Sequence, residues 1–285
     1  MQFVDTHCHL DDERYMEDLP QVLESASAKG VGACVIPAAS PATLARAIEI
    51  AQAYGQVYFA CGLHPCEIEH EGVDCAGLDS AASLAPESSA DYLAAVCAHN
   101  CARLERVFGH IGHEKCVAIG ECGLDYYHFL ESVPKETQKQ VQKEIFITQI
   151  KRAIELDLPL IVHIREASND AYEILARFPQ ARGILHCYNA DEVLLKLSDR
   201  FYYGIGGVAT FKNARRLLEV LPKIPLDRLV LETDAPYLTP HPFRGQRNSP
   251  EYIPLIASRV AEILGISQDT LAETSTKNAR VIFGI

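Results

Sequence analysis

A repeated alternation of short apolar runs and longer segments with helical periodicity constrains the fold of this chain more than any other feature. Alternating strands and helices are typical of βα units, and eight parallel strands with intervening helices close into a barrel. The sequence therefore predicts an α/β fold, a (β/α)8 TIM barrel in which residues 1–285 form a single domain. We count eight apolar runs, at 3–7, 33–37, 57–63, 116–120, 158–163, 183–186, 201–206 and 229–233.

The segments between the runs carry matching signals. Residues 139–156 have apolar side chains at helical spacing before Pro159, which predicts a helix that coats the barrel. Residues 125–136 and 236–254 are polar or Pro-rich, which predicts loops at the face where barrel active sites form. Residues 67–115 are less regular, with a helical run around 92–108, and are interpreted as a long βα excursion and not as a second domain.

Composition excludes several classes of protein. A formal net charge of −12 gives no global attraction for nucleic acid or anionic membranes, so phosphate binding would need a local basic site or bound cations. The ten cysteines are spread through a long chain without an apolar export segment at its N-terminus. We therefore expect free thiols, a cytoplasmic location and no membrane segment, whereas the oligomeric state is left open.

Histidines and carboxylates stand at the ends of the apolar runs. His7 and His9 alternate along one strand, so both imidazoles face one side and can chelate a cation, although a chance pair on a solvated face would look the same. Asp5 lies on that face too, either as a buried hydrogen-bonded acid or as a residue that orients a ligand histidine.

The remaining candidate ligands occupy equivalent strand ends. Glu121 could bridge two cations or be a salt-bridged acid, and His163 and His186 could be ligands or buried core histidines. Asp234 could bind metal or accept a proton from a metal-bound water. Four histidines and two carboxylates exceed the needs of one zinc ion, so we expect two divalent cations, chosen among Zn, Mn, Co and Mg. The predicted ligands are His7, His9, Glu121, His163, His186 and Asp234.

Other polar residues near the strand ends suggest substrate contacts. His64 ends the third run and is interpreted as a contact to substrate or leaving group, or else as a turn histidine fixed by Pro65. Arg165, Arg244 and Arg247 offer planar donors for phosphate, although the latter two could be ordinary surface arginines. Cys97 and Cys101 lie one helical turn apart and are assigned to packing in preference to a further metal site.

Together these motifs resemble the TatD family of metal-dependent deoxyribonucleases, which belongs to the amidohydrolase-like barrels. The resemblance extends from residue 3 to about residue 282. Departures are the segment after His186, which reads Cys187-Tyr188-Asn189-Ala190, and Gln246, where a lysine is common. The motifs that carry it are Asp5-Thr6-His7-Cys8-His9-Leu10, Gly62-Leu63-His64-Pro65, Gly120-Glu121-Cys122-Gly123-Leu124-Asp125-Tyr126, Val162-His163-Ile164-Arg165, Leu185-His186-Cys187, Glu232-Thr233-Asp234-Ala235-Pro236-Tyr237 and Arg244-Gly245-Gln246-Arg247-Asn248.

The resemblance implies a cytoplasmic hydrolase with a pair of divalent metals, in which the six predicted ligands match the family's ligand positions. It implies DNA as the substrate, cleaved from 3′ to 5′ on single strands, with His64 at a position associated with the active site. From the residues we expect Asp234 and Glu121 to serve catalysis together with His64. Two other functions stay open: an amidase, esterase or aminoacyl-tRNA deacylase that uses the same activated water, and a non-catalytic metal-binding scaffold.

Overall fold

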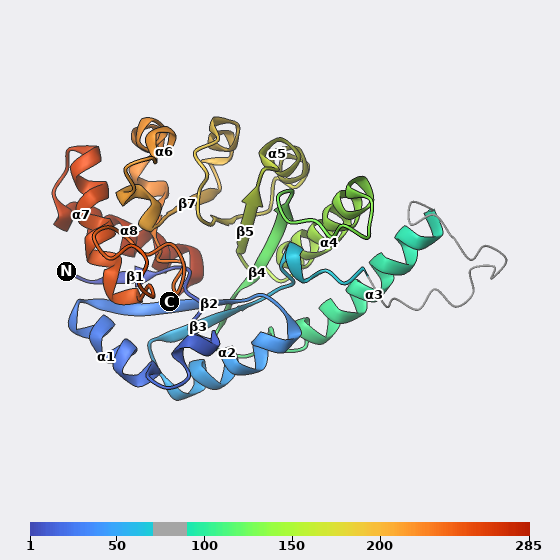
Figure 1. Cartoon of the computed structure of the whole chain (residues 1–285), viewed down its shortest axis with the longest axis horizontal. Helices are drawn as coiled ribbons and strands as arrows, with labels where there is room; N and C mark the ends of the chain where they lie inside the picture. Colours follow the sequence, from blue (N-terminus) through green and yellow to red (C-terminus); the bar gives the residue numbers. More distant parts are fainter. Residues whose placement is uncertain (71–89) are drawn as a thin grey trace.

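The computed structural model describes residues 1–70 and 90–285, and these form the (β/α)8 TIM barrel that the sequence predicts (Figure 1). Eight parallel strands make one sheet, and each strand is hydrogen-bonded to the next one in chain order. The strands are β1 Phe3–Asp5, β2 Val31–Ala38, β3 Val57–Cys61, β4 Cys116–Asp125, β5 Leu160–Arg165, β6 Gly183–Leu185, β7 Phe201–Ile205 and β8 Leu229–Leu231. Each of the eight predicted runs overlaps one strand, although β2, β4 and β5 extend beyond the predicted bounds, and Glu121 therefore lies within β4 and not after it.

The helices lie outside the strands, as Figure 1 shows for α1, α2, α4 and α5. The predicted helix at 139–156 is α4, which begins earlier because Pro134 supplies the N-cap, a position near the helix start where a missing backbone donor costs little. None of the helices in the described part of the chain is both long and apolar enough to cross a membrane. The α-helices are α1 Leu19–Ala28, α2 Pro41–Ala53, α3 Ala90–Phe108, α4 Lys135–Glu155, α5 Ser168–Ala176, α6 Arg215–Val220, α7 Ile253–Leu264 and α8 Gln268–Phe283.

The predicted excursion at 67–115 is described only in part. Its helical run is α3, which packs against α4 (Figure 1), and its segment 71–89 lies outside the described residues. Cys97 and Cys101 on α3 are half-buried and pack against the main hydrophobic core. Their surroundings therefore match the packing role that we expect for them.

The barrel closes where its first strand meets its last. Thr6 donates its backbone N–H to the carbonyl of Leu231, and the buried carboxylate of Asp5 accepts hydrogen bonds from the N–H and the hydroxyl of Thr233 at 2.9 and 2.6 Å. Burial outweighs these bonds and raises the pKa of Asp5 to about 7. Asp5 also accepts from the backbone N–H of His7, so of its two readings the structure supports the buried, hydrogen-bonded acid.

The interior of the barrel is filled by a layer to which every strand contributes. Ile282 and Phe283 of α8 cover this layer at the end of the barrel opposite the candidate ligands. Such a layer makes the barrel a packed core and not a pore, so a site can form only at its mouth. One apolar side chain per strand defines the layer: Val4, Val35, Ala60, Ala118, Ile161, Ile184, Tyr202 and Val230.

Candidate metal centre

The alternation of side chains along the strands places polar groups directly over this apolar layer. His163, His186 and Glu232 each stand two residues after a member of the layer, so their side chains enter the barrel from the same face, nearer the carboxyl ends of the strands. Gly204 stands at the same level on β7, and a Cβ there would lie 2.1 Å from an oxygen of Glu232. The sequence therefore makes room in this layer for a charged group and two imidazoles.

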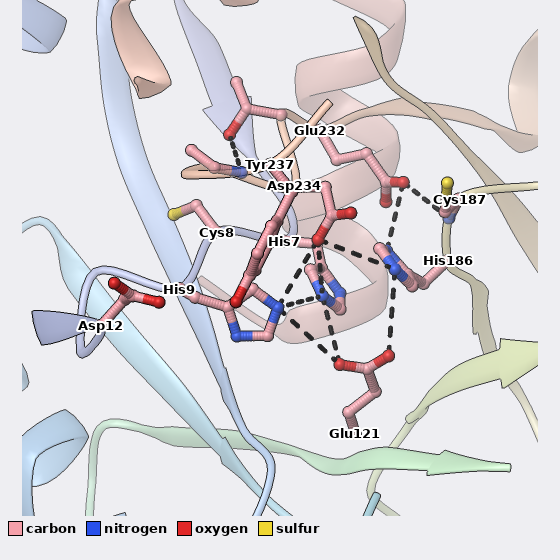
Figure 2. A network of polar contacts seen from close by, with 12 residues as sticks. His7, Cys8, His9, Asp12, Glu121, His186, Cys187, Glu232, Asp234 and Tyr237 are labelled. Carbon is pink, nitrogen blue, oxygen red and sulfur yellow. Dashed lines mark hydrogen bonds and ion pairs between the residues drawn. The ribbon is translucent and has the colours of Figure 1, made fainter. Parts of the chain in front are cut away.

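One half of the site is built at the seam between β1 and β8. His7 Nε2 lies 3.3 Å from His9 Nε2 and 3.3 Å from Glu121 Oε2 (Figure 2). Asp234 Oδ1 lies 3.7 and 3.5 Å from the same two nitrogens. The backbone N–H of Asp234 donates to the carbonyl of His7, which holds the two strands in register. Side chains from β4 and from the segments after β1 and β8 thus converge on His7 Nε2.

The other half of the site faces the second oxygen of Glu121. Its Oε1 lies 3.0 Å from His163 Nδ1, 3.5 Å from His64 Nε2 and 3.8 Å from His186 Nε2. Figure 2 shows the carboxylate of Glu121 with one oxygen toward His7 and His9 and the other toward His186. Glu121 therefore stands between two groups of imidazole nitrogens.

These donors fit a divalent cation. Ligands at about 2.0–2.2 Å from a tetrahedral cation lie roughly 3.3–3.6 Å from one another, close to the separations found here. Imidazole nitrogen and carboxylate oxygen suit several divalent metals without selecting one. Among the described residues, His7, His9 and Glu121 form one group of potential ligands, and His64, Glu121 and His163 form another. His64 thus lies among potential ligands, and its role as a substrate contact stays a prediction.

Burial and close charges shift the titration of these groups. Burial alone would raise the pKa of Glu121, but the neighbouring His7 and His64 hold it well below its usual range. Burial would lower the pKa of His9, yet its hydrogen bond with Asp234 raises it to about 9. The pKa of His163 is raised to about 9 by Asp125 and Glu121 against the same burial effect, whereas burial lowers that of His64 to about 3.

Metal affinity is expected to rise with pH. Below a pKa of about 9, His9 and His163 carry protons in the metal-free chain, and a cation must displace them. Each displaced proton lowers the apparent affinity about tenfold per pH unit below that pKa, and the effect ends above it. Calorimetric titration of Mn²⁺ in buffers of different ionisation enthalpy would measure the protons released. An affinity that stays constant between neutral pH and pH about 9 would contradict this titration.

Sequence reasoning missed two carboxylates that lie against the candidate ligand histidines. Asp125 Oδ2 lies 3.1 Å from His163 Nε2, and Glu232 Oε1 lies 3.2 Å from His186 Nδ1. A carboxylate on the far nitrogen fixes the tautomer and the ring orientation of a metal-binding histidine. The position of Glu232, two residues after Val230 on the same face of the strand, could have indicated that it points into the barrel. Asp125 offered no such indication, because it begins the polar segment that predicts a loop.

Replacing Glu232 with glutamine is expected to weaken metal binding by roughly 10–100-fold. Glutamine keeps an acceptor for the backbone N–H of Cys187, which lies 2.6 Å from Glu232 Oε1, but it loses the charge beside His186. Competition with a chromophoric chelator measures the change. Glu219→Gln, on an exposed side chain of α6, is the matched control, and equal affinities in the two variants would exclude this role for Glu232.

Helix α4 fixes the two loops that carry part of the site. Gln149 is fully buried and bonds both the N–H and the carbonyl of Leu63, the residue before His64, at 2.9 and 3.0 Å. Gln142 holds the N–H and carbonyl of Asp125 in the same way, at 2.9 Å each. The side-chain amides of Gln142 and Gln149 thus fix the backbone at the end of β4 and just after β3. The sequence of α4 predicts only a helix that packs on the outside of the barrel.

The three arginines are placed differently. Arg165 stacks over the ring of Tyr127 at 4.0 Å and lines a cavity of about 1040 Å³ that His163, His186 and Asp234 also border. Arg244 lies over the ring of Phe211 at 3.8 Å. Arg247 pairs with Asp18 at 2.9 Å and lies over Tyr15. The structure thus brings Arg165 to the site, whereas Arg244 and Arg247 have partners elsewhere and their phosphate contacts stay predictions.

Comparison with known proteins agrees with this geometry. The family model described as TatD related DNase matches residues 4–284. The chain is 37% identical to the uncharacterized metal-dependent hydrolase YabD of Bacillus subtilis, covering 99% of this chain and 98% of that protein, and 33% identical to YcfH of Escherichia coli K12, covering 100% and 97%. The crystal structure of YjjV, a TatD homologue from Escherichia coli K12, superposes with a TM-score of 0.77 at 28% identity, covering 99% and 98%. With the ligand groups assembled at the mouth of the barrel, the chain belongs to the TatD family of metal-dependent hydrolases.

Proposed function

We propose that the protein is a deoxyribonuclease that hydrolyses DNA phosphodiester bonds from the 3′ end with two divalent cations. The observation that carries the proposal is the position of Glu121, whose two oxygens face two separate sets of nitrogens. A carboxylate between two adjacent cations is the arrangement expected for an in-line displacement at phosphorus. The family description, TatD related DNase, supports DNA as the substrate.

Bound cations would polarise the scissile phosphate and lower the pKa of a water molecule toward neutrality. Asp234 is suited to take up the proton of that water. Burial would raise the pKa of Asp234, but its hydrogen bond with His9 and the nearby His186 keep it below the usual value, so the group is ionised at neutral pH. His7, His9 and His186 all approach its Oδ1, which leaves Oδ2 as the proton acceptor.

The cavity beside the centre would hold the substrate. Arg165 lines it and carries a permanent charge that can stabilise a phosphoryl oxygen. The guanidinium is held by its stacking on Tyr127, which limits the entropy lost on binding. Local charge of this kind, together with the cations, would offset the net charge of −12. Every cysteine that the structure describes is a free thiol, which supports a reducing cytoplasm as its location.

Degradation of labelled oligonucleotides tests the proposal. A single-stranded DNA labelled at its 5′ end should give a descending ladder with Mg²⁺ or Mn²⁺, and the same strand with its label at the 3′ end should release labelled mononucleotide first. Aryl ester and amide substrates are assayed beside it, with Co²⁺ and Zn²⁺ as further cations. Ester or amide turnover without any shortening of DNA would overturn the nuclease in favour of an acyl hydrolase.

Replacing Asp234 with asparagine is expected to lower DNA turnover by about 100-fold or more, because a general base contributes about that much. Asparagine retains an oxygen toward His7 and His9, so metal analysis should still find bound cation. Asp227→Asn removes an exposed carboxylate before β8 and is the control. Turnover that is normal in Asp234→Asn would exclude the proposed proton acceptor.

A further inference from the structure

A further cluster of potential metal ligands shares no residue with the other groups of potential ligands in the described part of the chain. It joins Cys66, in the short 3-10 helix Pro65–Glu67 after β3, to Asp125 at the end of β4 and His128 in the following loop. Cys66 Sγ lies 3.6 Å from Asp125 Oδ2 and 3.8 Å from His128 Nδ1, and the last two atoms are 2.9 Å apart. None of the three is among the six ligands predicted from the sequence.

We propose that Cys66, Asp125 and His128 form a separate site for a zinc-type divalent cation. Zinc bound by thiolate at about 2.3 Å and by nitrogen or oxygen at about 2.1 Å separates its ligand atoms by roughly 3.4–3.6 Å. The two separations that involve sulfur fit these values within a few tenths of an ångström. Only the pair of Asp125 and His128 is closer, and a small rotation of the exposed His128 ring would open it.

The carboxylate of Asp125 is fixed so that one oxygen serves this cluster. Its Oδ1 accepts the backbone N–H groups of Tyr127 and His128 at 2.9 and 2.8 Å, which leaves Oδ2 directed at the other ligands. The side chain of Asp125 is 1% exposed, whereas that of His128 is 52% exposed. A cation would therefore sit at the rim of the mouth with a buried anchor and one coordination position open to solvent.

The chemistry of the donors distinguishes this site from the one at Glu121. Thiolate sulfur is a soft ligand that favours Zn²⁺ or Co²⁺ over Mg²⁺, whereas the two groups that contain Glu121 offer only imidazole and carboxylate. The thiol of Cys187 lies beside His186 and Asp234 in the main centre, so any test must separate it from Cys66.

Binding of the cation would displace the proton of the Cys66 thiol to solvent and place the ring proton of His128 on Nε2. If no cation binds, Cys66, Asp125 and His128 are only hydrogen-bonded to one another. In that case, the pair of Asp125 and His128 would persist without the thiol of Cys66.

The two sites would be adjacent. Asp125 Oδ2 also lies 3.1 Å from His163 Nε2, and the other nitrogen of that ring faces Glu121. A cation on Asp125 would therefore lie one imidazole away from the Glu121 centre. The proposal does not depend on nuclease activity, since it rests on metal binding alone.

Titration of the chelator-stripped protein with Co²⁺ tests the site. Thiolate bound to Co²⁺ gives a charge-transfer absorption in the near ultraviolet, which imidazole and carboxylate ligands do not. The wild type should show this absorption, and Cys66→Ser should lose it together with one equivalent of bound metal. His128→Ala, on an exposed side chain, should weaken the absorbing site at least tenfold in Co²⁺ affinity.

Cys187→Ser is the matched control, because Cys187 is a thiol beside His186 and Asp234 in the main centre. It should retain the absorption of the wild type, which assigns the absorption to Cys66 and not to the thiol of the main centre. Circular dichroism confirms that each variant is folded. No absorption in the wild type, its persistence in Cys66→Ser, or its loss in Cys187→Ser would each overturn the proposed site.

Discussion

Replacing Glu121 with alanine is expected to lower turnover by about a thousandfold or more and to release metal from both halves of the centre. No other side chain in the described residues has one oxygen within 4.0 Å of His7 and His9 and the other within 3.8 Å of His64, His163 and His186. In the proposed nuclease, loss of cation charge at the scissile phosphate would remove several kcal/mol of transition-state stabilisation. Metal analysis after gel filtration and oligonucleotide degradation measure the two effects.

Glu131→Ala is the control for this prediction, because Glu131 is an exposed carboxylate on the loop after β4. It should keep both metal and turnover. A Glu121→Ala protein that retained the metal content of the wild type would show that Glu121 holds no cation. If Glu121→Ala retained its metal but lost turnover, Glu121 would act in catalysis without binding the metal.

Replacing Gly123 with alanine is expected to lower the free energy of unfolding by about 3–5 kcal/mol. Gly123 pairs with His163 across β4 and β5, and its backbone φ of +137° is one that residues other than glycine rarely adopt. A Cβ at this position would lie 2.0 Å from the carbonyl oxygen of His163 and 3.0 Å from its backbone nitrogen. Backbone in a central strand cannot move aside, so the two strands must separate.

Urea denaturation in the presence of a chelator measures this loss without a contribution from bound metal. Gly55→Ala is the matched control, since an added Cβ there meets no atom within 4 Å, and its stability should change by no more than about 1 kcal/mol. Because β4 and β5 also carry Glu121 and His163, turnover of Gly123→Ala should fall even where the protein is folded. Equal midpoints for the two alanine variants would contradict the clash.

The eight strands and the convergence of their ends could be predicted because periodicity and run length are local properties of the sequence. His7, Glu121 and His186 follow apolar runs, and the closure of the barrel brings these residues together at its mouth. The division of the candidate ligands into two groups around Glu121 could not be predicted. This division depends on the rotamer of Glu121 and on which nitrogen of His163 faces Glu121. Neither property can be inferred from the spacing of residues in the sequence.

The supporting groups were harder to predict for a different reason. Gln142 and Gln149 lie on a helix whose apolar periodicity is explained by packing alone, and their polar partners are backbone atoms more than fifteen residues away. Asp125 similarly reads as a loop residue, although three side chains from separate elements meet at its Oδ2. Hydrogen bonds between distant segments are set by tertiary structure, so a single sequence gives no pattern for them.

A cation bound at the seam between β1 and β8 would have a second role. Asp5 and Thr233, which hold this seam, are 228 residues apart in the chain, and His7 and Asp234 lie on either side of it. A metal ion held by both residues would act as a removable cross-link between the two ends of the fold, because it stabilises only the closed ring. The stability of the closed barrel would then depend on whether the metal centre is occupied, because the cation binds only when the first and last strands are together.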